Sequence, residues 1–351
     1  MREHETTARR DHTRRAPLPA AGLLAANVNA LAPALVLALI LILILIQTPA
    51  WALDVQGHRG ARGLAPENTL AGFRTALAIG VTTLELDLAM TADGALVVTH
   101  DRRLSPSLVR DRTGRWLAPP GPLVHSLRAV ELEAFDVGRV DPDSRYAQRF
   151  PDQRPVDGER IPRFAAVIAL ARDAHVGLNV EIKTDPGSAD ETPAPARFAE
   201  TVVGELRGQG FPNATIQSFD WRALAYVQRI APEYPTAYLT ASQRWLDNLE
   251  RGRPGPSPWT AGIDIDEYAG SAPQAVAAAG GAIWSPYYQE LDAASLAAAH
   301  RLGLRVVVWT VNAPQDMARL IDLGVDGIIT DRPDLLRTVM AARAMVLPPA
   351  R

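Results

Sequence analysis

The sequence predicts an α/β fold: a (βα)8 barrel, also called a TIM barrel, with an inserted cap segment after the second βα unit. From Leu53 onward, short apolar runs alternate with segments of helical period, which is typical of βα units repeated around a parallel sheet. There are eight such runs, the number of strands in this barrel. With 351 residues, 47% of them hydrophobic, the chain can bury the core of one such domain.

The expected strands are short and apolar, and turn residues or polar residues flank them. They cover residues 54–57, 83–88, 177–182, 215–218, 236–239, 282–284, 305–309 and 327–330. Between them the apolar residues recur with helical spacing, for example over 69–79, 164–174, 197–207, 296–302 and 317–323. The barrel domain is therefore expected to span residues 53–351.

A long segment between the second and third expected strands interrupts this alternation. It covers about residues 102–161 and is rich in Pro, Gly, Arg and Asp. Such a composition favours turns over regular elements. We therefore expect the segment to form the inserted cap.

The first 52 residues resemble an export signal. Arg9, Arg10, Arg14 and Arg15 precede an uncharged stretch whose apolar centre covers residues 35–46, and Ala50-Trp51-Ala52 follows it. These features predict a signal peptide over 1–52, cleavage after Ala52, and an exported protein that is periplasmic or secreted and has no stable membrane insertion. The alternative is a retained membrane anchor, because the stretch approaches the ~18–20 apolar residues that can span a bilayer.

The charge and the cysteine count exclude several classes of function. Removal of residues 1–52 leaves 36 − 5 = 31 basic and 39 − 3 = 36 acidic side chains, so the remaining chain is mildly acidic. Proteins that bind duplex nucleic acid normally carry a basic surface, so no nucleic-acid partner is expected. The chain contains no cysteine, which excludes thiol catalysis and zinc–thiolate sites.

Two expected strands carry carboxylates on one face. Thr83, Glu85 and Asp87 alternate with leucines in the second strand, and Glu181 holds the same kind of position between Asn179 and Lys183. Acids that converge inside a barrel repel one another, and a divalent cation removes that cost. Oxygen ligands favour Ca²⁺ or Mg²⁺. The alternative, that these acids only pair with surface arginines, is weakened because the pattern occurs twice.

Two histidines directly follow expected strands. His58 follows the first strand, and His100 follows the apolar run 96–99. Residues just past the strand ends lie on the catalytic face of a βα barrel. Because the unperturbed pKa of histidine is about 6.5, such a pair suits a general acid and a general base.

Lys183 is the only lysine among the 36 basic residues of the chain. This bias indicates a position that requires a compact point charge in place of a planar guanidinium. Arg59, beside His58, could complement it by bonding two phosphate oxygens at once.

These residues, in this order and spacing, resemble the glycerophosphodiester phosphodiesterase family. The shared motifs are His58-Arg59-Gly60, Pro66-Glu67-Asn68-Thr69, Glu85-Leu86-Asp87, Asp93-Gly94, His100-Asp101, Glu181-Ile182-Lys183, Gln217-Ser218-Phe219-Asp220, Trp309-Thr310-Val311-Asn312 and 327–331. The resemblance runs from about Gly57 to Asp334.

The resemblance implies a role for each matching residue. His58 and His100 correspond to the catalytic histidines, Glu85, Asp87 and Glu181 to the ligands of one divalent cation, and Arg59 and Lys183 to the phosphate contacts. The implied reaction is the hydrolysis of small-molecule glycerophosphodiesters to sn-glycerol 3-phosphate and an alcohol. Glu67 belongs to a motif but is expected to open a helix, where an acid is favoured by the helix dipole, so we leave it outside the site.

Two rival functions stay open on the sequence alone. A related lysophospholipid or sphingolipid phosphodiesterase of the same fold would need an apolar entrance, which Trp116, Leu117 and Pro119 could supply. An exported protein that only binds phosphate esters could use the same cation and basic pair, but it has no need of two histidines. The sequence indicates neither the leaving alcohol nor the oligomeric state.

Overall fold

A closed ring of parallel strands forms the centre of the fold. The structure is a computed structural model and describes residues 53–351. The strands of the ring are β1 (Asp54–Gly57), β2 (Thr83–Met90), β4 (Gly177–Ile182), β5 (Ala214–Ser218), β6 (Thr236–Thr240), β9 (Ile283–Pro286), β10 (Arg305–Val308) and β11 (Gly327–Thr330). Each is parallel to both of its neighbours, and β1 closes the ring by pairing with β2 and β11. The predicted (βα)8 barrel is confirmed.

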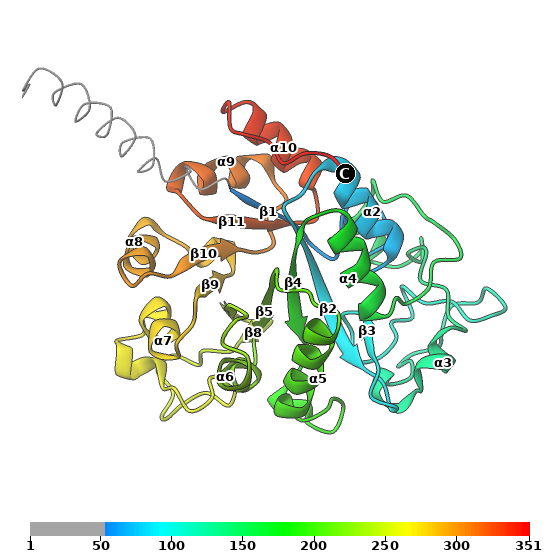
Figure 1. The fold of residues 1–351 in the computed structure, drawn as a ribbon, viewed down its shortest axis with the longest axis horizontal. Helices are drawn as coiled ribbons and strands as arrows, with labels where there is room; N and C mark the ends of the chain where they lie inside the picture. Colours follow the sequence, from blue (N-terminus) through cyan, green and yellow to red (C-terminus); the bar gives the residue numbers. More distant parts are fainter. Residues whose placement is uncertain (1–52) are drawn as a thin grey trace, which may run out of the picture. The chain divides into compact units, whose positions relative to one another are not determined.

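Helices surround the ring of strands (Figure 1). They are α2 (Leu70–Ile79), α4 (Phe164–Asp173), α5 (Pro195–Gly208), α6 (Trp221–Ile230), α7 (Ala272–Ala278), α8 (Ala293–Arg301), α9 (Pro314–Leu323) and α10 (Pro333–Ala341). Short 3₁₀ turns lie in the connections: η3 (Pro186–Ser188), η4 (Ile265–Tyr268) and η5 (Tyr288–Glu290).

The alternation in β2 divides its side chains between the helices and the interior of the barrel. Leu84, Leu86 and Leu88 are fully buried and belong to the main apolar core, which also contains Phe73 of α2 and Val167 of α4. Side chains of successive strand residues point to opposite faces, so Glu85 and Asp87 point into the barrel. The leucines thereby fix which way the two acids face.

The insertion at residues 102–161 leaves the barrel through an extra strand. That strand, β3 (Leu96–Val98), pairs antiparallel with β2, and η1 (Val124–Ser126), α3 (Ala129–Leu132) and η2 (Ala147–Arg149) follow it before α4 begins. The insertion therefore interrupts the second βα unit, whereas the sequence placed it after that unit. It has a small apolar core of its own, made of Val97, Leu104, Val109, Val124 and Leu132.

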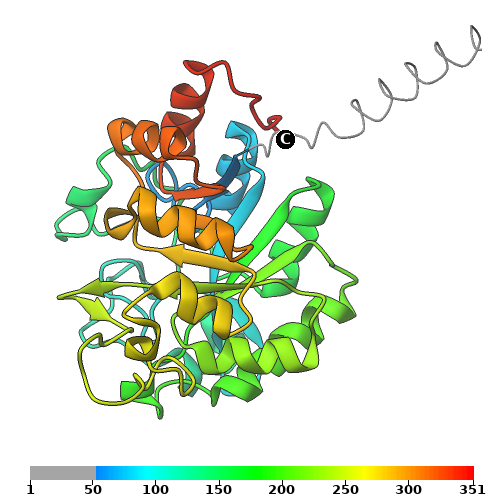
Figure 2. The same ribbon diagram turned by 90° about the vertical axis from the view of Figure 1, so that its left-hand side faces the viewer.

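A second excursion connects β6 to β9. It begins with a small antiparallel hairpin of β7 (Ser242–Gln243) and β8 (Leu246–Asp247). Figure 2 shows this excursion and the insertion on the same side of the barrel. Because β→α connections leave from the carboxyl ends of the strands, both excursions extend the end at which barrel enzymes build their active sites.

Within residues 53–351, no helix combines the length and the apolar character needed to cross a membrane. The signal peptide or anchor predicted over residues 1–52 lies outside the described residues.

Candidate active site

The register of the strands brings the three predicted ligand acids together. Glu85 is level with Asn179 and Asp87 is level with Glu181 in the β2–β4 pair. One carboxylate oxygen each from Glu85, Asp87 and Glu181 lies within 4.8 Å of the others, and all three residues are buried. The three acids thus lie together on the inward faces of two neighbouring parallel strands, and we call them the acidic trio.

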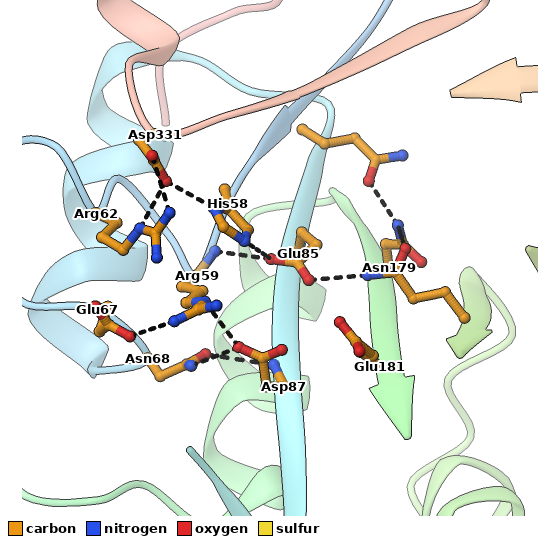
Figure 3. A network of polar contacts seen from close by, with 12 residues as sticks. His58, Arg59, Arg62, Glu67, Asn68, Glu85, Asp87, Asn179, Glu181 and Asp331 are labelled. Atoms are coloured by element: carbon orange, nitrogen blue, oxygen red, sulfur yellow. Dashed lines mark hydrogen bonds and ion pairs between the residues drawn. The ribbon is translucent and has the colours of Figure 1, made fainter. Parts of the chain in front are cut away.

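His58 is oriented by a carboxylate that directly follows the last strand of the barrel. Its Nδ1 atom lies 2.6 Å from Oδ1 of Asp331, and its Nε2 atom lies 3.9 Å from Oε2 of Glu85. Asp331 also accepts two hydrogen bonds from Arg62, of 2.8 and 3.0 Å (Figure 3). A third, of 2.7 Å, comes from the side chain of Asn312. The pairing of β1 with β11 explains this arrangement, because the His58 N–H donates to the carbonyl of Thr330.

The turn after β1 requires glycine. Arg59 has a φ of 50° and Gly60 a φ of 90°, so the chain turns back toward α2 in the left-handed region. A β-carbon on Gly60 would meet backbone atoms of Gly72 in α2 at 2.6 Å. The turn also points the backbone N–H of Arg59 at Glu85, to which it donates a hydrogen bond of 2.8 Å.

The guanidinium of Arg59 is held between two carboxylates. Its Nη1 atom donates to Glu67 at 2.6 Å, and its Nε atom lies 3.0 Å from Oδ2 of Asp87. Tyr146 of the insertion also donates to Glu67. The interpretation of Glu67 as a helix-opening residue is therefore wrong: Thr69 caps α2, and Glu67 lies before the cap, where it positions Arg59.

Glu85 is a buried carboxylate with neutral partners. Its Oε1 atom accepts from Nε2 of Gln217 at 2.9 Å, and Oε2 accepts from the Arg59 backbone. Within residues 53–351 no lysine or arginine side chain forms an ion pair with it. Burial, followed by repulsion from Asp87 and Glu181, raises the pKa of Glu85 well above its usual range.

The other two acids of the trio share the positive charge of Lys183. Its Nζ atom lies 2.8 Å from Oε1 of Glu181 and 3.5 Å from Oδ1 of Asp87. Burial raises the pKa of Glu181 to about 7, although Lys183 favours the ionised form. Burial has the same effect on Asp87, but Arg59, His100 and Lys183 outweigh it and hold the pKa of Asp87 well below its usual range.

His100 reaches the site from the end of β3. The Thr99 N–H donates to the carbonyl of Asp87 at 3.0 Å, which places His100 beside the trio. Its Nδ1 atom lies 2.7 Å from Oδ1 of the adjacent Asp101. Burial lowers the pKa of His100, and Arg59 and Lys183 lower it further. Both histidines are thus held through Nδ1, which leaves each Nε2 atom for chemistry.

The trio fits a hard divalent cation. Its three carboxylates lie beside only two cationic side chains, the ammonium of Lys183 and the guanidinium of Arg59. Arg59 also pairs with Glu67, so the carboxylates outnumber the cationic groups. Oδ1 of Asp87 is buried and has no hydrogen-bond partner within the described chain. Clustered carboxylate oxygens, two of them on acids whose pKa burial raises, could hold a hard divalent cation.

A cavity of about 1220 Å³ opens above these residues. The six predicted site residues that line it are His58, Arg59, Glu85, His100, Glu181 and Lys183. Asp87, the seventh, is fully buried beneath them. The seven predicted catalytic, phosphate-contact and metal-ligand residues therefore converge on one site. Trp116, Leu117 and Pro119, suggested as an apolar entrance, do not line this cavity.

Several residues that hold the site together have no role predicted from the sequence. They are Arg62, Asn68, Tyr146, Gln217, Asn312 and Asp331. Asn68 donates to Asp87 at 2.9 Å. Gln217, Asn312 and Asp331 belong to motifs at or just beyond the ends of strands, and this position is the signal that could have identified them. Tyr146 had no such signal, because it lies in the irregular insertion.

Comparisons with known proteins agree with this geometry. The model of the Glycerophosphoryl diester phosphodiesterase family matches residues 58–335. YhdW of Bacillus subtilis, a proposed glycerophosphodiester phosphodiesterase, is 30% identical over 80% of this chain and 94% of its own. The glycerophosphodiester phosphodiesterase of Caldanaerobacter subterraneus is 28% identical over 80% of this chain and 95% of its own.

Solved structures show the same fold. A proposed glycerophosphoryl diester phosphodiesterase from Silicibacter pomeroyi has a TM-score of 0.74 and 38% identity, and the match covers 84% of this chain and 95% of that one. A phosphodiesterase from Oleispira antarctica, solved with the product sn-glycerol-3-phosphate, has a TM-score of 0.61 and 22% identity over 83% of this chain and 98% of its own.

Proposed function

Since the chain belongs to the glycerophosphoryl diester phosphodiesterase family and is a phosphoric diester hydrolase, we propose that it hydrolyses glycerophosphodiesters to sn-glycerol 3-phosphate and an alcohol. In this proposal His58 and His100 exchange protons with the reacting oxygens. Arg59 and Lys183 contact the phosphate. Glu85, Asp87 and Glu181 hold one divalent cation, Ca²⁺ or Mg²⁺. When bound, such an ion acts as a Lewis acid that stabilises negative charge on phosphoryl oxygens.

His58 is the general base of the proposed reaction. Its Nδ1–H donates to Asp331, so the lone pair is on Nε2, at the cavity. Burial lowers the pKa of His58 to about 4. The positive charge of Arg62 lowers it as well, whereas the carboxylate of Asp331 raises it. The ring is therefore neutral at physiological pH and able to accept a proton from the nucleophile, which is either the 2-hydroxyl of the substrate's glycerol or a water molecule.

His100 is the general acid. Asp101 at its Nδ1 atom favours the imidazolium form, whereas burial, Arg59 and Lys183 oppose it. A bound phosphodiester would bring a negative charge to Arg59 and Lys183 and offset their effect on His100. In the proposed step the bond between phosphorus and the leaving oxygen breaks, and the His100 proton moves to that oxygen, which leaves as the alcohol. With water as nucleophile, the water oxygen forms the new bond to phosphorus. With the 2-hydroxyl as nucleophile, its oxygen forms that bond and gives a cyclic phosphate, which a water molecule then opens to sn-glycerol 3-phosphate.

Arg59 and Lys183 supply positive charge on opposite sides of Asp87. The Nε atom of Arg59 lies 3.0 Å from Oδ2 of Asp87, and Nζ of Lys183 lies 3.5 Å from Oδ1. Glu67 and Glu181 hold the two cationic side chains in place before the substrate arrives. Preorganised charge of this kind stabilises the negative charge that develops on phosphoryl oxygens in the transition state.

The observation that carries this proposal is the presence of two carboxylate-oriented histidines beside one buried acidic trio. The test is to incubate the purified protein with glycerophosphocholine and to identify the products by phosphorus NMR. The proposal predicts sn-glycerol 3-phosphate and choline. A related lipid phosphodiesterase would instead act on lysophospholipids or sphingolipids and leave glycerophosphocholine intact.

We further propose that the protein is exported and that its mature chain begins near Leu53. The Arg-rich start, the apolar stretch and Ala50-Trp51-Ala52 support this, as does a family match that begins at His58. Mass spectrometry of protein recovered from an exporting host tests it. An intact chain that begins at Met1 and stays in membranes would favour the anchor.

A further inference from the structure

Part of the cavity surface is made of aromatic rings. Phe219 follows β5, Tyr287 follows β9, Trp309 follows β10, and Trp245 lies in the turn between β7 and β8. The ring centroid of Trp245 is 5.5 Å from that of Tyr287 and 6.0 Å from that of Trp309, and Phe219 is 5.1 Å from Trp309. These four side chains form one continuous surface, which we call the aromatic wall.

The aromatic wall is open to the cavity. Trp245 is 60% exposed and the other three members are half-buried, whereas the core aromatic residues Trp221 and Tyr238 are each 1% exposed. A ring that serves only the core is covered by its neighbours. The rings of the wall therefore have surface left for a ligand in the cavity.

The wall carries no charge. Between Leu239 and Thr310, the described residues that line the cavity are all uncharged. The carboxylates on the rim near the insertion already have partners: Arg102 pairs with Asp185 and Glu191, and Asp101 is hydrogen-bonded to the ring of His100. A ligand at the wall thus meets π faces and no carboxylate that lines the cavity there, because Glu290 and Asp316, which act on Tyr287, do not line it.

A quaternary ammonium group suits such a surface. It has no N–H to donate, so it needs no carboxylate, and its positive charge is attracted to the faces of Trp and Tyr rings. A primary ammonium would lose its hydrogen bonds to water and gain none in return. An inositol or glycerol group would leave its hydroxyls unpaired in the same way.

We propose that the aromatic wall binds the leaving alcohol and selects one that carries a quaternary ammonium group. This inference rests on the proposed phosphodiesterase function and adds its preferred substrate class. The wall and the catalytic residues line the same cavity. In this inference the phosphate of the diester lies at Arg59 and Lys183 and its alcohol lies on the wall. The polar rim that contains Tyr146 and Arg102 is left for the glycerol hydroxyls.

The test compares glycerophosphocholine with its neutral isostere, in which 3,3-dimethylbutanol replaces choline. The two substrates share size and shape and differ only in the positive charge. We expect a kcat/KM for the choline ester that is about tenfold higher, as one partly desolvated cation–π contact predicts. Trp245→Leu should bring this ratio close to one, and Trp245→Phe should give an intermediate value.

Trp116→Leu is the matched control. Trp116 is also a partly exposed tryptophan, but it packs against Arg110 at 5.6 Å and does not line the cavity. Its substitution should leave the ratio unchanged. The exposure of Trp245 at a hairpin turn means that its substitution should not unfold the protein.

If the parent enzyme hydrolyses the two esters with equal kcat/KM, the inference is overturned. The proposed function would still stand in that case, because both esters are hydrolysed. Faster, Trp245-dependent turnover of a lysophospholipid whose head group has no quaternary ammonium, such as lysophosphatidylglycerol, would also overturn it, because the wall would then hold an acyl chain. If none of these diesters, nor glycerophosphoethanolamine, is hydrolysed, the proposed function itself fails and the inference falls with it.

Discussion

The Nδ1 atom of His58 lies 2.6 Å from Oδ1 of Asp331, although the two residues are 273 positions apart in the chain. Closure of the barrel between β1 and β11 makes this contact possible. Arg62 and Asn312 hold the carboxylate from its other sides. Burial opposes the ionised form, but Arg62 and His58 hold the pKa of Asp331 well below its usual range, so the carboxylate that orients His58 stays charged.

Asp331→Asn should lower kcat by about 10²–10⁴, because an amide no longer fixes the tautomer of His58. KM should change little, since the side chain of Asp331 bonds to His58, Arg62 and Asn312 and to neither of the phosphate contacts, Arg59 and Lys183. Steady-state kinetics measure both values. Asp334→Asn is the matched control: Asp334 also pairs with an arginine, Arg332, but does not touch His58. Near-parental kcat in Asp331→Asn would show that His58 needs no carboxylate.

His58→Ala and His100→Ala should each lower turnover by ~10²–10⁴ and should not be additive, since both act in the same proton transfers. His300→Ala serves as the control, because His300 lies on the surface and pairs with Asp326. Circular dichroism and thermal unfolding should show that all three variants fold. If either site variant kept near-normal turnover, that histidine would have no catalytic role.

The ring of His58 should stay neutral to an unusually low pH. Burial lowers its pKa from 6.5 to about 4, so between these values an unfolded chain binds a proton that the folded chain does not. This group therefore destabilises the fold as the pH falls from 6.5 to about 4 and has no effect above 6.5. Histidine NMR titration, assigned with His58→Ala, measures the pKa, and a midpoint near 6.5 would contradict the burial argument.

Lys183→Arg should fold and yet be nearly as inactive as Lys183→Ala. The ammonium fits between Glu181 and Asp87, at 2.8 and 3.5 Å, and its side chain is 18% exposed. A planar, forked guanidinium is larger and should displace Glu181 or the phosphate. A shift of about 1 Å can cost on the order of 10²-fold in rate. Turnover close to that of the parent enzyme would make the single lysine an accident of composition.

Local patterns predicted the barrel and the acids that face its interior. The alternation around Glu85 and Asp87 set the direction of their side chains, and strand ends placed His58 and His100 at the catalytic end. The partners that come from distant or irregular segments could not be predicted in this way. Asp331 reaches His58 only because the barrel closes, and Trp245 lies on a hairpin whose strands are too short to give a pattern. Tyr146 reaches Glu67 from an insertion without periodicity.

The dependence of glycerophosphocholine hydrolysis on a divalent cation tests the account most directly. Exhaustive treatment with EDTA, followed by dialysis, should abolish the release of sn-glycerol 3-phosphate, and added Ca²⁺ or Mg²⁺ should restore it. Glu85→Ala, Asp87→Ala and Glu181→Ala should be inactive under all of these conditions, and calorimetry should show that they no longer bind the ion. A chelated parent enzyme that keeps its full rate, with no metal found by elemental analysis, would contradict the account.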